Sequence, residues 1–589
     1  MVLTGLFALA AALCLWPSSA SADPVSAVLV GMVLAAGAPG FATAVAVTTF
    51  ILTTTLSLAI SYAASALLRP SAAGKSAATP LQSTPYGAKV TSKSPDQAHA
   101  IIFGRTRVGA VAYPIAATDV NHNLHTCLLV TGHKINGFKQ LWIGDEVFEV
   151  ADMVANDGYI PASTGSKYAG YVRGFFHNGD PNQAADAHMV DEIPEWTVDH
   201  RGRGLAYANL RFRFGPKGPQ PPLFSDGVPN VTPVLEGVCE AYDPRDGTYK
   251  YTTNPALLAA WFLCNADYGF GLAYATSLKG PAPDYPGEAA LIAAANACDE
   301  TVTKADGSTG PRYTCNGALL SSQPKQDILG RILGAMAGWR AYDGETHFLY
   351  AGVYHAPTES FTNDDLRGQG MVIDSVSPIG ELWNTVRGKF FGEVNNWQSS
   401  DFPTVVGATY LSQDGREIAA DIELPLTNDP EMAQRIAKIH LEKSRRQYKV
   451  KAPCKFTAWR TMAGATIAWT ETVRRGWSAK PFEVRQCDYV VEVQDGAASL
   501  NVDLQLQETA PGVYSWTSTD ATILAEVPRT TLPDPMTVAS PSNLVALEDI
   551  YVGRDGAGVK TSAVLTWQES PDAFVVDYEV AYKLRSDSV

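Results

Sequence analysis

Charge is what this 589-residue sequence has least of, and the shortage is greatest at its beginning. Charged residues make up 18% of the chain, and Asp23 is the only one among the first 68 residues. The formal net charge of −15 argues against general binding to nucleic acid, which needs clustered Lys and Arg to neutralise phosphates. An acidic wall would still let nucleic acid pass without sticking, because like charges repel.

Catalytic and metal-binding motifs are missing as well. The sequence has no G-x-x-x-x-G-K-[ST] loop, no G-x-S-x-G and no spaced group of Cys and His. No two cysteines form a C-x-x-C pair, which excludes the usual zinc and redox patterns. We expect reduced core cysteines in a protein folded in the cytosol, with a Cys298–Cys315 disulfide left open. The cysteines are Cys14, Cys127, Cys239, Cys264, Cys298, Cys315, Cys454 and Cys487.

Three short clusters could be read as sites, and each has a plainer structural interpretation. His122 and His125 have H-x-x-H spacing, but helical metal sites use i, i+4 spacing and a third ligand, so we expect a loop. Asp199-His200-Arg201 has no nucleophile nearby, so we expect a structural hydrogen-bond cluster. Residues 243–247 lack the ligand pattern of a calcium loop, so we expect a tight turn. We therefore predict no catalytic, cofactor-binding or metal residue, and no enzyme.

A long apolar region occupies residues 1–69. Residues 6–16 and Ala20-Ser21-Ala22 resemble a secretory signal, but no Lys or Arg precedes them, so we do not expect cleavage. Residues 41–68 could cross a bilayer as a helix, and Gly37-Ala38-Pro39-Gly40 predicts a turn between two helices. The region could be a membrane anchor, a buried bundle in an oligomer, or a segment stored in an assembly and later released into a membrane. Residues 70–99 are predicted to be an extended linker.

From residue 100 onward, apolar runs of strand length alternate with Gly, Pro and Asn, which predicts a mainly β chain with inserted helices (α+β). We expect hairpins over residues 100–113 and 139–150, the second turning at Gly144-Asp145. Residues 124–131 read as a strand covered on both faces. Further strands are expected over 450–456, 481–493 and 499–507, and one face of a strand should carry Leu210, Phe212 and Phe214 opposite Arg211 and Arg213.

Three helices have clear start signals. One begins at Asn254-Pro255, with an apolar stripe that includes Leu257 and Phe262. A second begins at Ser322 to Pro324, ends near Gly338 and leads into a hairpin turning at Asp343-Gly344. A third begins at Asn428-Asp429-Pro430 and ends in the basic stretch 443–446.

The end of the chain changes character again. Val564-Leu565-Thr566-Trp567 and the segment 577–582 resemble strands B and C of a fibronectin type III sandwich. Such a sandwich needs roughly seven strands and about 100 residues, so we expect the natural polypeptide to continue past Val589. The expected organisation is apolar helices 1–69, linker 70–99, a first region 100–370, a second region 371–530, linker 531–543, and the start of a fibronectin-like domain at 544–589.

Several phrases, taken in order, resemble the host-specificity protein J family of lambda-like phages, which includes hub proteins of gene transfer agents. The resemblance covers about residues 95–589, and its strength lies in the order and spacing of the phrases. They are Thr131-Gly132-His133 with Gly137 and Ile143-Gly144-Asp145-Glu146, Trp196-Thr197-Val198-Asp199-His200, Tyr242-Asp243-Pro244-Arg245, Asn254-Pro255-Ala256-Leu257 with Asn265-Ala266-Asp267-Tyr268-Gly269, Arg312-Tyr313-Thr314-Cys315-Asn316-Gly317, and Asn384-Thr385-Val386-Arg387-Gly388.

The resemblance implies a trimeric hub at the distal end of a siphophage tail, assembled in the host cytoplasm. Tube-like β-barrels would close the tail tube and adapt its six-fold symmetry to three-fold, and fibronectin-like modules would follow. Expected partners are two further copies, the distal tail and other tail-tip proteins, the tape measure protein, a host receptor bound through C-terminal parts not present here, and DNA that passes through the lumen without specific binding. The apolar N-terminus departs from the pattern of lambda itself.

From these expectations we hypothesise that the hub opens for DNA ejection and that residues 24–69 contact a host membrane. The alternative is a bacterial surface adhesin, anchored by the N-terminus and presenting fibronectin-like modules. The absence of a basic segment before the apolar run disfavours the adhesin, as do the scattered cysteines. No cofactor is expected in either case.

Overall fold

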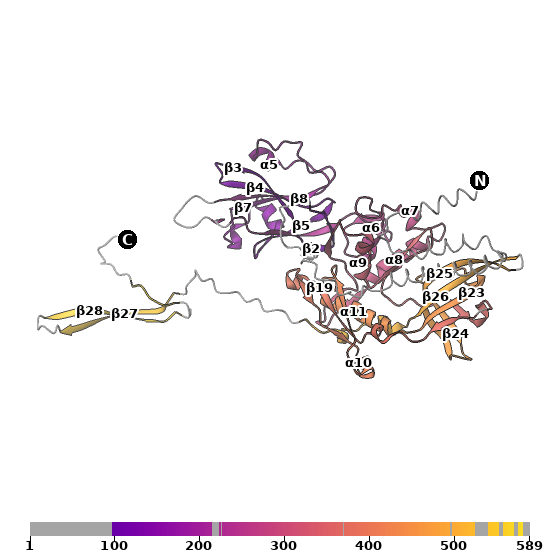
Figure 1. Ribbon diagram of the computed structural model, residues 1–589. Helices are drawn as coiled ribbons and strands as arrows, with labels where there is room; N and C mark the ends of the chain where they lie inside the picture. Colours follow the sequence, from indigo (N-terminus) through magenta and orange to yellow (C-terminus); the bar gives the residue numbers. More distant parts are fainter. Residues whose placement is uncertain are drawn as a thin grey trace, which may run out of the picture. The chain divides into compact units, whose positions relative to one another are not determined.

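The computed structural model describes residues 97–214, 223–224, 227–368, 370–494, 497–524, 540–552, 558–570 and 575–580 (Figure 1). The chain divides into two compact units, residues 1–83 and 84–589, and every described residue belongs to the second. The expected apolar helices at 1–69, and the expected linker up to residue 96, lie outside the described residues. No helix in the described part is long and apolar enough to cross a membrane.

Two four-stranded antiparallel sheets surround a first hydrophobic core. Their inward side chains, among them Leu128, Leu141 and Phe212, form one buried cluster. The first sheet has the order β3-β4-β8-β7, from β3 (Val111–Thr118), β4 (Asn123–Thr131), β8 (Ala206–Arg213) and β7 (Val172–Asn178). The second has the order β2-β9-β5-β6, from β2 (Arg105–Arg107), β9 (Val231–Val238), β5 (Ile135–Ile143) and β6 (Glu146–Glu149), and α4 (Val150–Ala155) follows it.

Local patterns in this region are largely confirmed. The β5–β6 hairpin turns where expected, with Gly144 at φ 59°, a left-handed conformation that favours glycine. The strand expected at 124–131 is β4, which lies between β3 and β8. In β8, Leu210 and Phe212 are buried whereas Arg213 is exposed, so the predicted division of faces is correct.

The hairpin expected over residues 100–113 is wrong. Instead β1 (Ala100–Phe103) pairs with β14 (Gly317–Leu320), while β2 pairs with β9 and β3 with β4. Ile101, Ile102 and Phe103 are fully buried, so β1 is covered on both faces. A Cβ at Gly104, where φ is +57°, would lie 2.3 Å from Asn316 Oδ1. The close approach of a distant segment, which no local pattern reports, decides the pairing.

Helices build a second core that draws on residues from Ile101 to Tyr514. Asn254 and Asp429 cap two of these helices, because each side chain accepts hydrogen bonds from backbone N–H groups of the first turn. All three predicted helices are present. The main helices are α6 (Pro255–Cys264), α8 (Pro286–Asp299), α9 (Lys325–Gly334) and α11 (Pro430–Ser444). The apolar stripe expected on α6 is too narrow, since α6 packs against α8 and α9 and is buried nearly all round.

Small sheets and short helices complete this part of the chain. The hairpin predicted at Asp343-Gly344 is present between β15 and β16. The two-stranded sheets are β10 (Ala241–Asp243) with β11 (Thr248–Lys250), β12 (Thr301–Thr303) with β13 (Thr309–Pro311), and β15 (Trp339–Tyr342) with β16 (His347–Tyr350). A further sheet places β19 (Thr385–Phe391) between β20 (Ser399–Asp401), β21 (Val405–Val406) and the parallel β22 (Ala419–Leu424). The short helices are α5 (Ala187–Glu192), α7 (Tyr274–Ser277), α10 (Ala408–Asp414) and α12 (Pro511–Tyr514).

A six-stranded sheet encloses the third core, which includes Trp469, Phe482 and Val502. Its order is β17 (Glu359–Thr362), β24 (Thr466–Glu471), β25 (Trp477–Gln494), β26 (Ala497–Glu508), β23 (Lys449–Lys455) and β18 (Val372–Asp374). β17 and β24 are parallel, and the other neighbours are antiparallel. The strands expected over 450–456, 481–493 and 499–507 are therefore confirmed as β23, β25 and β26.

Near the end of the chain, β27 (Ser542–Val552) and β28 (Val559–Gln568) form a separate two-stranded sheet. The strand expected over 564–567 lies within β28. The strand expected over 577–582 is wrong for residues 577–580, which have no strand conformation, and its last two residues lie outside the described part. The mixed α+β class is confirmed, with more strand than helix. The tube-like barrels, the fibronectin-like sandwich and the domain boundaries remain predictions.

Candidate functional site

The two histidines of the H-x-x-H pattern point to different neighbours. His122 is exposed in a turn whose residues Asp119, Val120 and Asn121 all have positive φ. His125 is buried in β4, where its Nε2 lies 2.8 Å from Thr118 Oγ1 and 3.6 Å from the Glu192 carboxylate. The expected loop therefore holds for His122 only. Among the residues that the structure describes, no three His, Cys, Asp or Glu side chains are grouped to hold a metal ion.

The Asp199-His200-Arg201 cluster is a hydrogen-bonded loop, as predicted. The Thr197 N–H donates to His200 Nδ1 at 2.9 Å, and Arg201 Nε donates to the Val198 carbonyl at 3.0 Å. The Trp196 ring stacks on the His200 ring with centroids 5.0 Å apart. Each of these contacts fixes the loop, and none activates a nucleophile.

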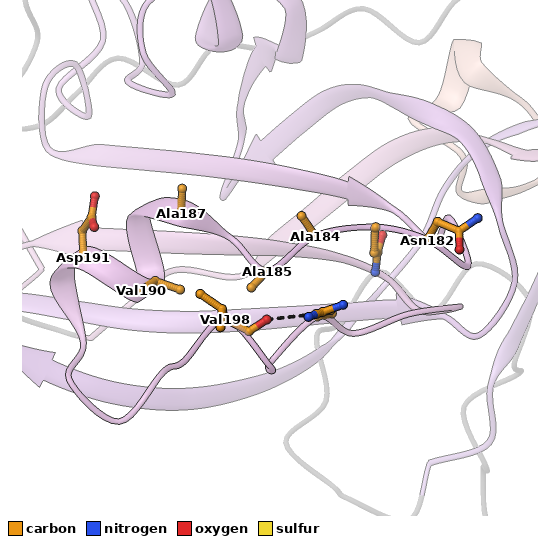
Figure 2. A pocket seen from close by; sticks show the side chains of 9 residues that line it. Asn182, Ala184, Ala185, Ala187, Val190, Asp191 and Val198 are labelled. Atoms are coloured by element: carbon orange, nitrogen blue, oxygen red, sulfur yellow. Dashed lines mark hydrogen bonds between the residues drawn. The ribbon is translucent and has the colours of Figure 1, made fainter.

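This loop borders a shallow pocket of about 390 Å³ (Figure 2). Gln183 joins its two sides, because its Nε2 donates to the Gly202 and Leu205 carbonyls while its Oε1 accepts from the Gly179 N–H. Small side chains and one charged group of each sign form the lining: Asn182, Gln183, Ala184, Ala185, Ala187, Val190, Asp191, Val198 and Arg201. These nine residues include no Ser, Cys, His or Lys.

Residues 243–247 form the predicted tight turn between β10 and β11. The Gly247 N–H donates to the Asp243 carbonyl at 2.9 Å. The Asp243 carboxylate is buried, and hydrogen bonds from Arg245 hold its pKa well below the usual range, with Lys250 adding to the effect. The charge of Asp243 is thus satisfied within the chain and does not form part of a cation site.

The cysteines behave as core residues. All seven described cysteines are free thiols, including the buried pair Cys298 and Cys315. Burial raises the pKa of the Cys127 and Cys454 thiols to about 12. Thiols of this kind are poor nucleophiles at neutral pH.

Residues of the family-like phrases act instead as internal anchors. Thr131 Oγ1 donates to the Ala100 carbonyl at 2.6 Å, and His133 Nε2 accepts from the Ile102 N–H at 3.1 Å. Together they attach β1 to the end of β4. Burial lowers the pKa of His133 to about 4, so its ring stays neutral and keeps an acceptor for that N–H at physiological pH.

Asn316 joins segments that lie far apart in the sequence. Its Oδ1 accepts from the Arg105 N–H at 2.9 Å, and its Nδ2 donates to Asn428 Oδ1 at 3.0 Å. The Asn316 N–H also donates to the Leu426 carbonyl at 2.8 Å. One buried side chain thereby connects β2, the start of β14 and the segment before α11.

Asn384, which is fully buried, joins separate segments of the sheet around β19. Its Nδ2 donates to Asp414 Oδ2 and to the Arg416 carbonyl, both at 2.8 Å, and its Oδ1 accepts from the Ile418 N–H at 2.8 Å. Thr131, His133, Asn254, Asn316 and Asn384 are the anchor residues below. Sequence reasoning predicted that Asn254 caps a helix and missed the roles of the other four, although a polar residue within a buried phrase signals a required hydrogen bond.

No family model matches the chain, and the search of curated proteins gives no match. Among solved structures, the chain is similar to one from the virion of a native gene transfer agent particle, with 15% identity, a TM-score of 0.48, and coverage of 75% of this chain and 91% of that one. A tail protein from Neisseria meningitidis MC58 has 9% identity, a TM-score of 0.26, and coverage of 70% and 96%. A 43 kDa tail protein of prophage MuSo2 from Shewanella oneidensis has 7% identity, a TM-score of 0.24, and coverage of 72% and 99%. These TM-scores are too low to establish a shared fold.

Proposed function

We propose that this chain is a structural protein of a phage-like tail, and specifically its distal hub. One observation carries the proposal. The anchor residues belong to the phrases that resemble the protein J family, and they are bonded inside the chain instead of lining a cavity. In this chain the phrases therefore supply hydrogen bonds that hold the fold together, as a structural component requires.

The bonding of these residues suits a rigid frame. A buried polar network whose members are all satisfied fixes one arrangement of the chain, because every alternative leaves polar groups unpaired. Asn316 and Asn384 bond to segments that are up to 211 positions away in the sequence. A particle component that must keep its shape while a polymer passes under pressure benefits from such cross-connections.

The finer proposal is a trimer that closes the tail tube. Three copies would surround a lumen through which DNA passes, and the net charge of −15 per chain would limit sticking of DNA to the wall. Tail-tip proteins and the tape measure protein would dock on this ring. Fibronectin-like modules would extend from it toward the host.

The apolar N-terminus carries a separate part of the proposal. We infer that residues 24–69 enter a host membrane when the hub opens, because residues 41–68 carry no charge and are long enough to span a bilayer as a helix. A deletion of residues 24–69 should leave assembled particles that adsorb normally and fail to deliver DNA. Normal delivery by the deletion particles would overturn this part and leave the hub proposal in place.

The structural role is tested by disrupting the coding sequence of this chain and counting particles. Loss of the hub should yield capsids without complete tails, and supply of the intact chain from a plasmid should restore them. Supply of a variant with the exposed His122→Ala and His200→Ala substitutions should restore them equally, because neither residue is an anchor. Complete, infectious particles from the disrupted strain would contradict the proposal.

A further inference from the structure

The second core and the six-stranded sheet meet at a contact formed largely by aromatic and charged side chains. The second and third cores are separate buried clusters that share no residue. Between them, the Tyr350 ring packs on Gly464, where a Cβ would lie 2.3 Å from that ring, and the Tyr350 hydroxyl donates to the Ala463 carbonyl at 3.5 Å. Tyr350 also stacks on Trp339. We call this contact the joint, and its residues are Trp339, Tyr350, His355, Lys443, Gly464, Glu483 and Tyr514.

A lysine from the last turn of α11 lies in the joint. The Lys443 Nζ is 4.5 Å from the centre of the Trp339 ring and 5.2 Å from that of the Tyr514 ring. Lys443 is partly buried and forms no ion pair or hydrogen bond with any described residue. Aromatic faces attract a cation, but they replace only part of the hydration shell that an ammonium loses on burial. This loss of water lowers the pKa of Lys443 to about 8, so at neutral pH the joint still holds a cation.

The charges that face Lys443 do not balance it closely. Glu483 of β25 attracts the ammonium, whereas Arg485, two residues further along the same strand, repels it. The Arg485 Nη2 lies 3.1 Å from Glu483 Oε2, so the carboxylate is already paired with another cation. Lys443 therefore has no acid of its own, and the closed joint gives it less stabilisation than water would.

The other titratable groups around Lys443 carry no charge at neutral pH. His440, three residues earlier in α11, and His355 are neutral because burial lowers the pKa of both rings, that of His440 to about 4. Tyr350 and Tyr514 stay protonated, because burial raises the pKa of both hydroxyls. The charge of Lys443 is thus the one that changes first when the pH rises above neutral.

Three polar atoms of the joint are also buried without a hydrogen-bond partner in the described part of the chain. They are Trp339 Nε1, His355 Nε2 and Glu483 Oε1. A buried polar atom without a partner destabilises the arrangement that buries it. Separation of the sheet from the helices would return these atoms and the ammonium to water, while each separate core keeps its own packing.

We propose that the joint is an opening device, at which the six-stranded sheet separates from the second core, and that the charge of Lys443 favours the open state. The opening is a property of the chain itself. In the proposed hub, the same separation is the movement that opens a path for DNA, and this part of the inference rests on the proposed function.

The test is hydroxyl-radical footprinting of the full chain, with the oxidation of individual side chains measured by mass spectrometry. Separation exposes Trp339 and Tyr350, so their oxidation reports the open fraction. Trp469 in the third core is 0% exposed and shows whether the sheet stays folded. Trp459, which is 48% exposed, normalises the radical dose.

Lys443→Met keeps a long side chain and removes its charge. We expect this variant to lower the oxidation of Trp339 and Tyr350 at pH 7 by about threefold or more, because an uncharged side chain loses no ionic hydration in the closed joint. Lys451→Met is the matched control, since it removes an exposed charge from β23 of the same sheet, and it should leave the oxidation unchanged.

A rise in pH should have the same effect on the unsubstituted chain. The pKa of Lys443 is about 8 in the closed joint, against about 10.4 in water. Between these values the open state binds more protons than the closed state, so closing is favoured as the pH rises. The oxidation of Trp339 should therefore fall between pH 7 and pH 9.5, and Lys443→Met should show no such fall.

Equal oxidation of Trp339 and Tyr350 in the Lys443→Met and unsubstituted chains, with Trp469 protected in both, would overturn the proposal. Higher oxidation in Lys443→Met would overturn it as well, because the charge would then close the joint. If Trp469 becomes oxidised because Lys443→Met does not fold, the pH series on the unsubstituted chain decides, and an unchanged oxidation of Trp339 would contradict the device.

Particles test the connection with DNA release. Particles that carry Lys443→Met should assemble and adsorb normally, and release DNA about threefold more slowly or worse, because their joint opens less often. Unchanged release would overturn the role of the joint in ejection and leave the hub proposal in place. Failure of the hub proposal looks different, since complete, infectious particles would then form without the chain.

Discussion

The β25–β26 hairpin is core at one end and surface at the other, although apolar side chains line one face along its length, with a bulge between Val484 and Gln486 that shifts the phase of β25. At the base, Phe482 and Leu504 are at most 1% exposed. At the tip, Val491 and Leu500 lie on the same apolar face with nothing described above them. The comparison shows that the pattern of apolar residues sets which side chains share a face of the hairpin. The length of the neighbouring strands decides whether that face is buried.

The largest contrast is expected from one substitution made at both ends. Leu504→Ala should lower the stability of the six-stranded sheet by about 2–5 kcal/mol, because it opens a cavity in a packed core. Leu500→Ala, on the same strand, should change the stability of the isolated chain by less than about 0.5 kcal/mol. Thermal unfolding, monitored through hydrogen exchange of the amides in β23 to β26, measures the change in stability of both variants. Equal losses would show that the tip is packed and would break the comparison.

Acidification separates a buried anchor from an exposed histidine. Burial lowers the pKa of His133 to about 4 in the folded chain, against about 6.5 when unfolded. Between these values the unfolded chain binds more protons, so the stability that is present above pH 6.5 is lost as the pH falls toward 4, by up to roughly 3 kcal/mol. Hydrogen exchange of the Ile102 amide at pH 7 and pH 4.5 reports the loss.

A His133→Gln variant should lose less protection over the same pH range, since Gln does not titrate. His122→Gln, at an exposed turn, should keep the full pH dependence. If His133→Gln and the unsubstituted chain have the same slope, the anchor role of His133 is contradicted.

The Asn384→Ala substitution should cost about 2 kcal/mol, because four hydrogen bonds are lost and their partners remain partly buried. We expect the first unfolding transition to occur at a lower temperature and hydrogen exchange to be faster around β19 and α10. Asn182→Ala removes the same group at an exposed position and is the control. A loss no larger than that of the control would mean that Asn384 does not hold this frame.

The smallest effect is expected from the ion pairs that Arg367 makes near the tip of the β25–β26 hairpin. Arg367→Ala should loosen the tip by about 1 kcal/mol or less, because Glu492 and Asp503 are both partly exposed and surface ion pairs are weak. Faster hydrogen exchange limited to the tip, with the base unchanged, would sharpen the comparison. Faster exchange across the whole sheet would show that base and tip are one unit.

Much of the local structure could be predicted from the sequence. Asn254-Pro255 and Asp429-Pro430 start helices because the Asn254 and Asp429 side chains cap the first turn, and that information lies within a few residues. The pairing of β1 could not be predicted, since its partner β14 is over 200 positions away. Which apolar faces are covered also depends on distant strands, and this is why the exposed tip of the β25–β26 hairpin could not be predicted.

The same distinction between local and long-range contacts applies to the candidate sites. Turns and loops at Asp243 and His200 could be predicted, because their bonds are local. The roles of Asn316 and Asn384 could not, because a side chain that bonds across the chain has no spacing signal of its own. Their membership in family-like phrases pointed to importance without giving the reason.

The most direct test of the hub proposal is immunogold electron microscopy of purified particles, with antibody against residues 100–530. We predict gold confined to the distal end of the tail. Gold on cell envelopes, with the particles bare, would contradict the account and favour a membrane-anchored adhesin.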